Sequence, residues 1–333
     1  MKHTNVGLFV PHEGCPHMCS FCNQRSISGS TKKLTPDGVD NAVATACESN
    51  SSSREIAFFG GSFTAIERAY MTNLLKAASK HIDGKNFSGI RISTRPDCIN
   101  EEICQILKEY GVTAVELGAQ SMDDNVLMLN DRGHSAQDVV NAANLLKSKG
   151  FELGLQMMTG LLGSDDNESI RTAQEIIALS PDTVRIYPTV VLKGTKLARL
   201  YEQGLYKPQS VERAVKICST LLEMFFDTDI RVIRLGLHSG GDILNNYVAG
   251  AFHPSLRELC DGEIYLKRAL SVMKENNIVQ GKVELFVMPT AVSQMTGQKK
   301  KNLDALRSKG YECKVIPHCG LSKYEVSASP VQG

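Results

Sequence analysis

Three cysteine residues near the N-terminus have the spacing of a single inorganic site. Cys15, Cys19 and Cys22 are separated by three and then two residues, and they follow an apolar run, 6–10, that predicts a strand. One short loop can therefore wrap all three thiolates around one cluster. A [4Fe–4S] cluster usually takes four cysteine ligands, so a set of three leaves one iron open to a small molecule.

A zinc site is the alternative for the same cysteines. His12 and His17 lie beside them, and three cysteines with one histidine form an ordinary zinc ligand set. Zinc ligands usually come as two separated pairs, which this loop lacks, so we favour the iron–sulfur cluster. The other seven cysteines are scattered along the chain and are expected to be free thiols in a reducing compartment.

A pair of glycines follows the second apolar run of the chain. Gly60 and Gly61 come after residues 55–59 and precede Ser62. Paired glycines let the main chain approach a ligand that a Cβ atom would keep away, although they also form ordinary tight turns. Because this pair comes one strand–helix unit after the cysteine loop, we favour a role in binding a ligand.

Further polar residues lie at or near the ends of the later strands. Gln120 and Gln156 have amides that suit the hydroxyl groups of a ribose, whereas Arg95 has a planar guanidinium that suits a carboxylate or phosphate. Lys193 follows the sixth strand, where it could hold an anion or a carbonyl group. The alternative is structural: a surface ion pair for Arg95, helix caps for Asp97 and Ser121, and a solvated surface charge for Lys193.

Length and charge exclude several classes of protein. The chain has 333 residues, a net charge of +1 and 42% hydrophobic residues, which allows a large core and provides no global basic field for nucleic acid or membrane. No segment resembles a signal peptide or reaches the length of a membrane span. We expect a cytoplasmic protein with no membrane partner.

Short apolar strands alternate with amphipathic helices over most of the chain, which predicts βα units and a parallel sheet. The expected strands cover residues 6–10, 55–59, 89–93, 114–117, 152–158, 183–187 and 231–235. The expected helices between them cover residues 70–81, 101–110, 136–149, 169–179 and 211–226. The fold class is α/β, a partial (β/α) barrel over residues 1–250. A doubly wound sheet is the competing fold, but no G-x-G-x-x-G follows the first strand.

A small α+β domain is expected over residues 251–333. Its order is a helix, a strand, a short helix, a turn, a helix and a strand, and from residue 253 onward twelve basic residues oppose eight acidic ones. The segment around the turn Gly297-Gln298-Lys299-Lys300 resembles half of a KH domain, whose loop clamps a nucleic-acid backbone. A purely solvated basic turn is the structural alternative.

The cysteine loop, with the aromatic Phe21 before its last cysteine, resembles the cluster loop of radical S-adenosylmethionine (SAM) enzymes. Several later segments narrow the resemblance to the radical SAM domain of the Elongator catalytic subunit. These segments are residues 59–64, 94–97, 116–121, 132–134, 157–165 and 186–195. The matches keep their order from about residue 5 to 235.

The resemblance implies a [4Fe–4S] cluster on Cys15, Cys19 and Cys22, whose open iron chelates SAM. It implies that Gly60, Gly61 and Ser62 meet the amino group of SAM. The remaining implied SAM contacts are Phe21, Arg95, Gln120 and Gln156, and Lys193 is implied as a catalytic residue. The expected activity is reductive cleavage of SAM to a 5′-deoxyadenosyl radical for modification of a tRNA base.

The implied partners are a tRNA substrate and an electron donor such as flavodoxin or ferredoxin. The chain lacks the length for the acetyltransferase domain of the Elongator subunit, so a separate acetyltransferase is expected if acetyl-CoA takes part. Two alternatives stay open: radical chemistry on a small metabolite or porphyrin-like ring, and an RNA-binding or iron-sensing protein without enzymatic activity.

Overall fold

The computed structural model describes residues 4–10, 15, 18–23, 33–47, 54–237 and 242–331. Within it the chain divides into two compact units. Unit 1 comprises residues 1–209 and 228–251, and unit 2 comprises residues 210–227 and 252–333. Residues 210–227 thus belong to unit 2, although they lie inside the range 1–250 that the sequence assigns to the barrel.

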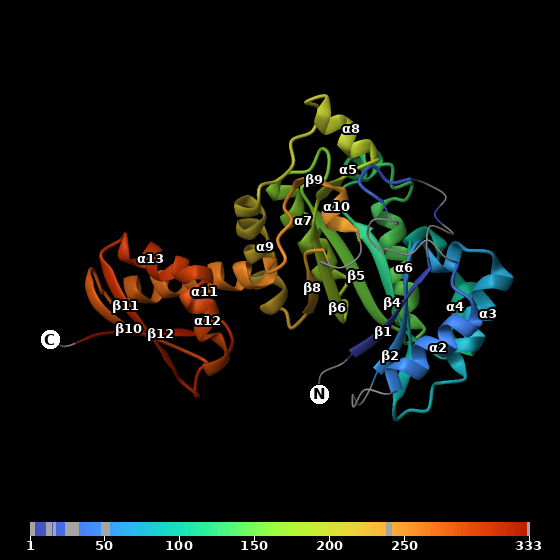
Figure 1. Ribbon diagram of the computed structural model, residues 1–333, viewed down its shortest axis with the longest axis horizontal. Coiled ribbons are helices and arrows are strands. Elements are labelled where there is room, and N and C mark those ends of the chain that lie inside the picture. The colour runs from blue at the N-terminus through green and yellow to red at the C-terminus, as the bar shows by residue number, and fades with distance from the viewer. Residues whose placement is uncertain are drawn as a thin grey trace. The chain divides into compact units, whose positions relative to one another are not determined.

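Unit 1 contains a seven-stranded parallel sheet that curls into a partial barrel (Figure 1). Its strands are β1 (Thr4–Val10), β2 (Arg54–Gly60), β3 (Phe87–Thr94), β4 (Val112–Gln120), β5 (Glu152–Thr159), β6 (Thr183–Pro188) and β8 (Arg231–Leu235). Their order in the sheet follows their order in the chain. A doubly wound sheet reverses its strand order at a switch point, so this order confirms the partial barrel.

Helices connect these strands and pack on the sheet. They are α2 (Pro36–Cys47), α3 (Arg68–Ser79), α4 (Glu101–Glu109), α5 (Asp124–Leu129), α6 (Ala136–Ser148) and α7 (Asp166–Ala178). Helix α4 shows why they form: the Asn100 side chain caps its first turn, and Ile103, Cys104 and Leu107 repeat at helical spacing on its buried face. On the strands, Ile56, Phe58, Ile90 and Ile92 are fully buried and supply much of the core.

A smaller group of elements in unit 1 follows the sixth strand. It comprises α8 (Lys196–Glu202), α10 (Ile243–Asn246) and an antiparallel ribbon of β7 (Val190–Leu192) and β9 (Tyr247–Gly250). The sequence analysis did not predict these four elements, nor α2 and α5. Each is short or weakly patterned, so its formation depends on tertiary contacts.

Unit 2 combines helices with a three-stranded mixed sheet. Its helices are α9 (Val211–Phe226), α11 (Leu256–Glu275), α12 (Val292–Thr296) and α13 (Lys301–Arg307), and its strands are β10 (Gly281–Val287), β11 (Tyr311–Pro317) and β12 (Val326–Pro330). The central strand β10 is parallel to β11 and antiparallel to β12. The predicted order from helix to final strand is present, and β12 is an addition to it.

All seven predicted barrel strands and all five predicted helices between them are present, with boundaries shifted by a few residues. Among the described residues, no helix is both long and apolar enough to cross a bilayer.

Candidate functional site

The carboxyl ends of the first strands bring the predicted polar residues to one edge of the sheet. Strands β1 and β2 are parallel and in register, with Val10 beside Gly60, while β3 and β4 end at Thr94 and Gln120. Cys15 follows β1 by five residues. Barrels of this type place their reactive groups at this edge, which makes it the candidate site.

The second half of the cysteine loop is fixed by hydrogen bonds to two neighbouring segments. Ser20 donates its main-chain N–H to the Asn130 carbonyl (3.0 Å) and its hydroxyl to Asn130 Oδ1 (2.8 Å). The N–H of Leu197 donates to the Ser20 carbonyl (2.8 Å), and the Asn23 amide donates to the Lys193 carbonyl (2.9 Å). The segment after α5 and the start of α8 therefore hold the loop in place.

Phe21 anchors the loop to an apolar cluster. Its half-buried ring packs against a group formed by Val191, Leu197, Ala198 and Tyr206. These residues come from β7, α8 and the segment after it. Phe21 therefore holds the loop in place by packing. This role is separate from the SAM contact that the resemblance implies for Phe21.

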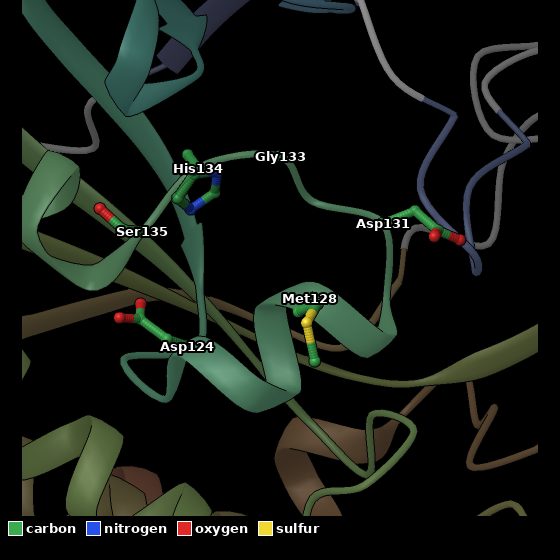
Figure 2. A pocket seen from close by; sticks show the side chains of 6 residues that line it. All are labelled: Asp124, Met128, Asp131, Gly133, His134 and Ser135. Carbon is green, nitrogen blue, oxygen red and sulfur yellow. The ribbon is translucent and has the colours of Figure 1, made fainter.

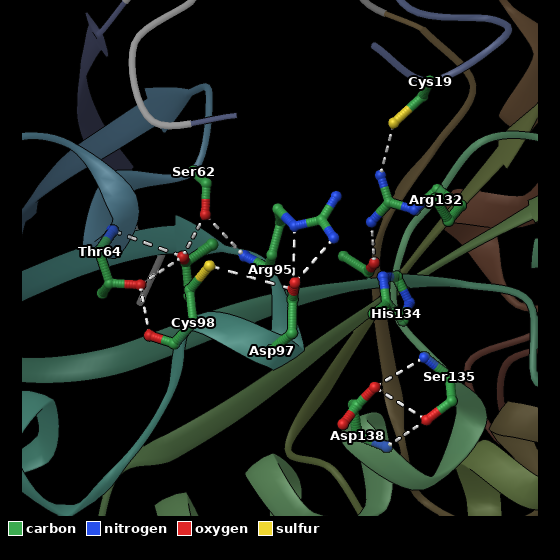
Figure 3. Close-up of polar contacts among 12 residues, drawn as sticks. Cys19, Ser62, Thr64, Arg95, Asp97, Cys98, Arg132, His134, Ser135 and Asp138 are labelled. Atoms are coloured by element: carbon green, nitrogen blue, oxygen red, sulfur yellow. Dashed lines mark hydrogen bonds and ion pairs between the residues drawn. The ribbon is translucent and has the colours of Figure 1, made fainter. Parts of the chain in front are cut away.

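Arg132 ties the cysteine loop to the sheet, as Figure 3 shows. Its Nη1 donates to Cys19 Sγ at 3.2 Å and its Nη2 donates to the carbonyl oxygen of Gly118 on β4. Its Nε atom is buried and has no hydrogen-bond partner among the described residues. The sequence analysis assigned no role to Arg132, although it quoted the Arg-Gly-His segment that contains it.

Cys15 lies near the same positive charge. Burial raises the pKa of the Cys15 thiol, while a hydrogen bond from the Ser62 main chain and the guanidinium groups of Arg132 and Arg95 act in the opposite direction. Cys19 is near enough to Cys15 to interact electrostatically. In the described part of the chain, no three Cys, His, Asp or Glu side chains converge on a single metal ion. His12 and His17 lie outside the described residues.

The first glycine of the pair is required by the backbone. Gly60 has φ of +119°, and a Cβ atom there would lie 2.5 Å from the carbonyl oxygen of Val10. The next residue, Gly61, donates its N–H to that same oxygen at 3.1 Å. Residues with a Cβ atom rarely adopt this backbone conformation. Glycine at position 60 therefore allows the end of β2 to lie close to the end of β1.

Ser62 and Arg95 belong to a buried polar network (Figure 3). The Ser62 hydroxyl is 2.8 Å from Thr94 Oγ1 and accepts the main-chain N–H of Arg95 at 3.2 Å. Arg95 Nε and Nη2 donate to the two carboxylate oxygens of Asp97 at 2.9 and 2.8 Å. Only 5% of the Arg95 side chain is exposed, so the surface ion pair expected as its alternative is wrong.

Two other structural alternatives fail in the same region. Asp97 pairs with Arg95, and the helix that follows, α4, is capped by Asn100 instead. Ser121 donates to Glu168, and the cap of α5 is Asp123. Neither Asp97 nor Ser121 is therefore a helix cap.

Gln120, the last residue of β4, has an unusual backbone conformation and an unpaired side-chain oxygen. Its φ is 69°, in the left-handed region that few side chains other than glycine occupy. Its Oε1 atom is buried and has no hydrogen-bond partner among the described residues. A Cβ atom at Gly118 would lie 2.9 Å from Gln120 Nε2 and 3.3 Å from Arg132 Nη2. Gly118 thus leaves room for both side chains at the site.

Gln156 lies deeper in the sheet than Gln120. Its Nε2 donates to Glu116 Oε2 at 3.0 Å, and Glu116 is 1% exposed. The same carboxylate pairs with Arg185 on β6: Arg185 Nη2 donates to Oε1 at 2.8 Å, and Arg185 Nε lies 2.7 Å from Oε2. The sequence analysis missed this buried ion pair, for which a charged residue within an apolar strand is the signal.

Lys193 stands in the turn between β7 and α8. Its Nζ donates to the Asn245 carbonyl at 2.9 Å and its N–H donates to the Asn246 carbonyl at 2.8 Å. Because Asn23 donates to the Lys193 carbonyl, this turn links the cysteine loop to the segment containing α10.

A hollow of about 360 Å³ lies between α5 and the segment that precedes α6 (Figure 2). His134 lines it, and His134 Nε2 is 3.2 Å from the Ala119 carbonyl. Burial, with the nearby charges of Arg132 and Arg95, lowers the pKa of His134 to about 4. His134 is therefore neutral at pH 7. Ser135 and Asp138 form a capping box at the start of α6.

Comparison with known families gives two matches. The model of the radical SAM superfamily matches residues 9–176, which is half of the chain. The model of a radical SAM C-terminal domain matches residues 181–267. The cofactors of this superfamily are a [4Fe–4S] cluster and SAM.

Curated relatives carry names from tRNA modification. The tRNA uridine(34) acetyltransferase of Methanocaldococcus jannaschii is 33% identical over 50% of this chain and 34% of its own length. The human Elongator complex protein 3 is 31% identical over 51% of this chain and 35% of its own length. The chain thus spans about a third of these relatives.

Solved structures show the same fold. The Elp3 protein of Methanocaldococcus infernus superposes with a TM-score of 0.61 and 22% identity, over 83% of this chain and 63% of that chain. The coproporphyrinogen III oxidase of Escherichia coli gives a TM-score of 0.50 and 14% identity, over 83% and 79% of the two chains.

Proposed function

Because the chain belongs to the radical SAM superfamily, we propose that it holds a [4Fe–4S] cluster on Cys15, Cys19 and Cys22 and modifies a tRNA base. The observation that carries this proposal is the position of the cysteine loop, which follows β1 at the carboxyl edge of a partial barrel. When bound there, the reduced cluster and SAM supply a 5′-deoxyadenosyl radical that removes a hydrogen atom from a substrate.

The residues at this edge fit the two cofactors. Gln120 Oε1 and Arg132 Nε are buried without partners among the described residues, and a polar ligand such as SAM has hydroxyl and carboxylate groups for them. Arg132 already donates to Cys19 Sγ, which suits a thiolate that ligates iron. In an iron–sulfur cluster each cysteine thiolate binds a different iron atom. The three cysteine sulfurs therefore lie further apart than the ligands of a single metal ion.

The protein groups would perform separate tasks around these cofactors. Arg132 and Arg95 provide positive charge beside Cys15, and Gln120 would orient the ribose of SAM. Gly60 and Gly61 would leave the main chain open to its amino group, with Ser62 supporting them through Thr94. These assignments, with Gln156 as a further SAM contact and Lys193 as a substrate-binding group, are proposals.

The substrate and partners are proposed from the relatives. Two of them are named for uridine(34) of tRNA or for Elongator, so we propose a tRNA uridine as the modified base. An electron donor such as flavodoxin or ferredoxin would reduce the cluster. An acetyltransferase acting on the same tRNA is a further partner that these names suggest.

The proposal is tested by supplying tRNA to the reconstituted protein under anaerobic conditions. We expect tRNA to accelerate formation of 5′-deoxyadenosine, and mass spectrometry of digested tRNA to detect a changed uridine when acetyl-CoA and an acetyltransferase are added. Cleavage of SAM that no tRNA accelerates, with a tetrapyrrole accelerating it instead, would replace tRNA by a porphyrin-like substrate.

A further inference from the structure

Three aromatic rings are partly open on the inner face of the sheet in unit 1. Phe9 on β1 is 37% exposed, and its ring centroid is 6.3 Å from that of its strand neighbour Phe59. Tyr187 on β6 is half-buried, as is its strand neighbour Met158 on β5. Rings inside a barrel are normally covered by other side chains, so these surfaces suit a flat apolar ligand.

Arg185 crosses this face from β6. Its guanidinium carbon lies 5.1 Å from the centroid of the Phe59 ring on β2, although β3, β4 and β5 lie between these two strands in the sheet. Its Nη2 donates to Glu116 Oε1 at 2.8 Å, and its Nε lies 2.7 Å from Glu116 Oε2 as an ion pair without hydrogen-bond geometry. The third nitrogen, Nη1, is 3.5 Å from the hydroxyl oxygen of Tyr187, a long contact that leaves it able to donate to another acceptor.

The charged side chains described on this face form a network of ion pairs. Arg91 pairs with Glu55 at 2.6 Å and with Glu152 at 2.9 Å, and it also lies 3.6 Å from Glu116. Arg185 pairs with Glu116, its strand neighbour is Arg234, and Arg231 lies 3.8 Å from Glu152. A neutral ring with a carbonyl group would find a donor here without disturbing these ion pairs, whereas a carboxylate or phosphate would compete with the glutamates for the arginines.

We propose that this face holds the pyrimidine ring of an RNA base, with Phe59 and Tyr187 against the ring and Arg185 Nη1 donating to a ring carbonyl. The proposal rests on the proposed function and specifies how its substrate is held. Single-stranded bases are commonly bound by aromatic rings and arginine planes. Arg185 acts here as a positioning residue that Glu116 keeps in place.

The test compares two anticodon stem-loop RNAs that differ only at the first anticodon position, which carries either uridine or an abasic site. Binding of both to the reconstituted full-length protein is measured by fluorescence anisotropy. We expect the wild-type protein to prefer the uridine RNA roughly 5- to 150-fold, the range found for stacking of one base. Phe59→Leu and Arg185→Lys should each remove most of this preference in protein whose circular dichroism spectrum shows that it is folded.

Matched controls separate this effect from a loss of folding. Phe226→Leu and Arg171→Lys make the same changes at exposed positions and should keep the preference. Tyr187→Leu removes the ring but keeps an apolar side chain at a half-buried position, so it serves if another variant unfolds, and it should weaken the preference for uridine.

The inference is overturned by equal binding of both RNAs by the wild-type protein, or by an unchanged preference in folded Phe59, Tyr187 and Arg185 variants. Either result leaves the proposed function standing if tRNA still accelerates SAM cleavage. Competition by a carboxylated tetrapyrrole but not by RNA would also overturn it, in favour of a different substrate.

Discussion

Arg132 connects the cysteine loop, the end of β4 and the segment before α6 through a single side chain. Its guanidinium donates to Cys19 Sγ and to the Gly118 carbonyl. Hydrogen bonds to ligating sulfur and local positive charge both stabilise the reduced, more negative form of an iron–sulfur cluster. Arg132 should therefore set the reduction potential of the cluster that we propose here.

Replacing Arg132 by methionine should shift that potential in the negative direction, because the reduced cluster loses a donor and a positive charge. The shift is measured by redox titration followed by electron paramagnetic resonance. Arg171→Met, at an exposed position on α7, is the matched control and should leave the potential unchanged. Equal potentials in the wild type and the Arg132 variant would contradict this role.

His134 should make the stability of the protein depend on pH. Its pKa is lowered to about 4 in the folded state by burial and by Arg132 and Arg95, with Asp97 acting in the opposite direction. The unfolded chain binds a proton near pH 6.5, so the stability that neutral His134 provides is complete above that pH and falls between pH 6.5 and 4.

At pH 5 this difference amounts to about 2 kcal/mol of unfolding free energy. His134→Gln should remove that part of the loss between pH 7 and pH 5, as measured by urea unfolding at both values. Identical pH dependence in the variant and the wild type would mean that folding does not lower the pKa of His134.

The sequence indicated some residues of the candidate site and missed others. Cysteine spacing and amide type pointed to Cys15, Cys19 and Gln120 because these are local chemical signals. Glu116 and Arg185 form a buried ion pair although they are 69 positions apart in the sequence. No local sequence pattern therefore contains this pair. The left-handed backbone of Gln120 is likewise set by a shift in register between β4 and β5.

At the scale of elements, periodicity predicted the long helices and buried strands well. Helix α9 has the predicted bounds 211–226, because its buried residues repeat at helical spacing over 16 positions. Within the described residues, the four-residue strand β9 and the three-residue strand β7 pair with each other alone. A segment that short has too few positions for a period to be recognised.

The basic turn between α12 and α13 is the element of unit 2 that we propose contacts RNA. Lys299 and Lys300 both have positive φ, 53° and 66°. The buried Asn302 side chain holds the turn by donating to the carbonyl oxygens of Gly262 (2.8 Å) and Gln294 (3.2 Å). The turn is therefore a defined structure that presents exposed lysines.

Changing Lys299, Lys300 and Lys301 together to alanine should weaken binding of tRNA and flatten its dependence on salt. Each lost phosphate contact reduces the slope of log affinity against log salt by roughly 0.7 for single-stranded RNA. The control removes the same charge elsewhere in unit 2, at Lys282, Lys309 and Lys314. Equal slopes for the two triple variants would exclude a specific role for the turn.

At the scale of the whole molecule, two compact units divide the proposed tasks. Unit 1 carries the cysteine loop, the polar edge and the aromatic inner face, and unit 2 carries the basic turn. The chain leaves unit 1 at residue 209, forms α9 in unit 2 and returns at residue 228. Composition and length were compatible with two units. The assignment of helix α9 to unit 2, however, depends on long-range packing that no sequence pattern contains.

The central claim is that this chain cleaves SAM with a cluster held by three cysteines. The most direct measurement is the formation of 5′-deoxyadenosine by anaerobically reconstituted protein after reduction with dithionite, with iron and sulfide measured in the same sample. The account predicts one [4Fe–4S] cluster per chain and slow formation of 5′-deoxyadenosine. Both should be lost in Cys15→Ala, Cys19→Ala and Cys22→Ala and retained in Cys47→Ala. Stoichiometric zinc without sulfide, or an intact cluster that leaves SAM uncleaved, would contradict it.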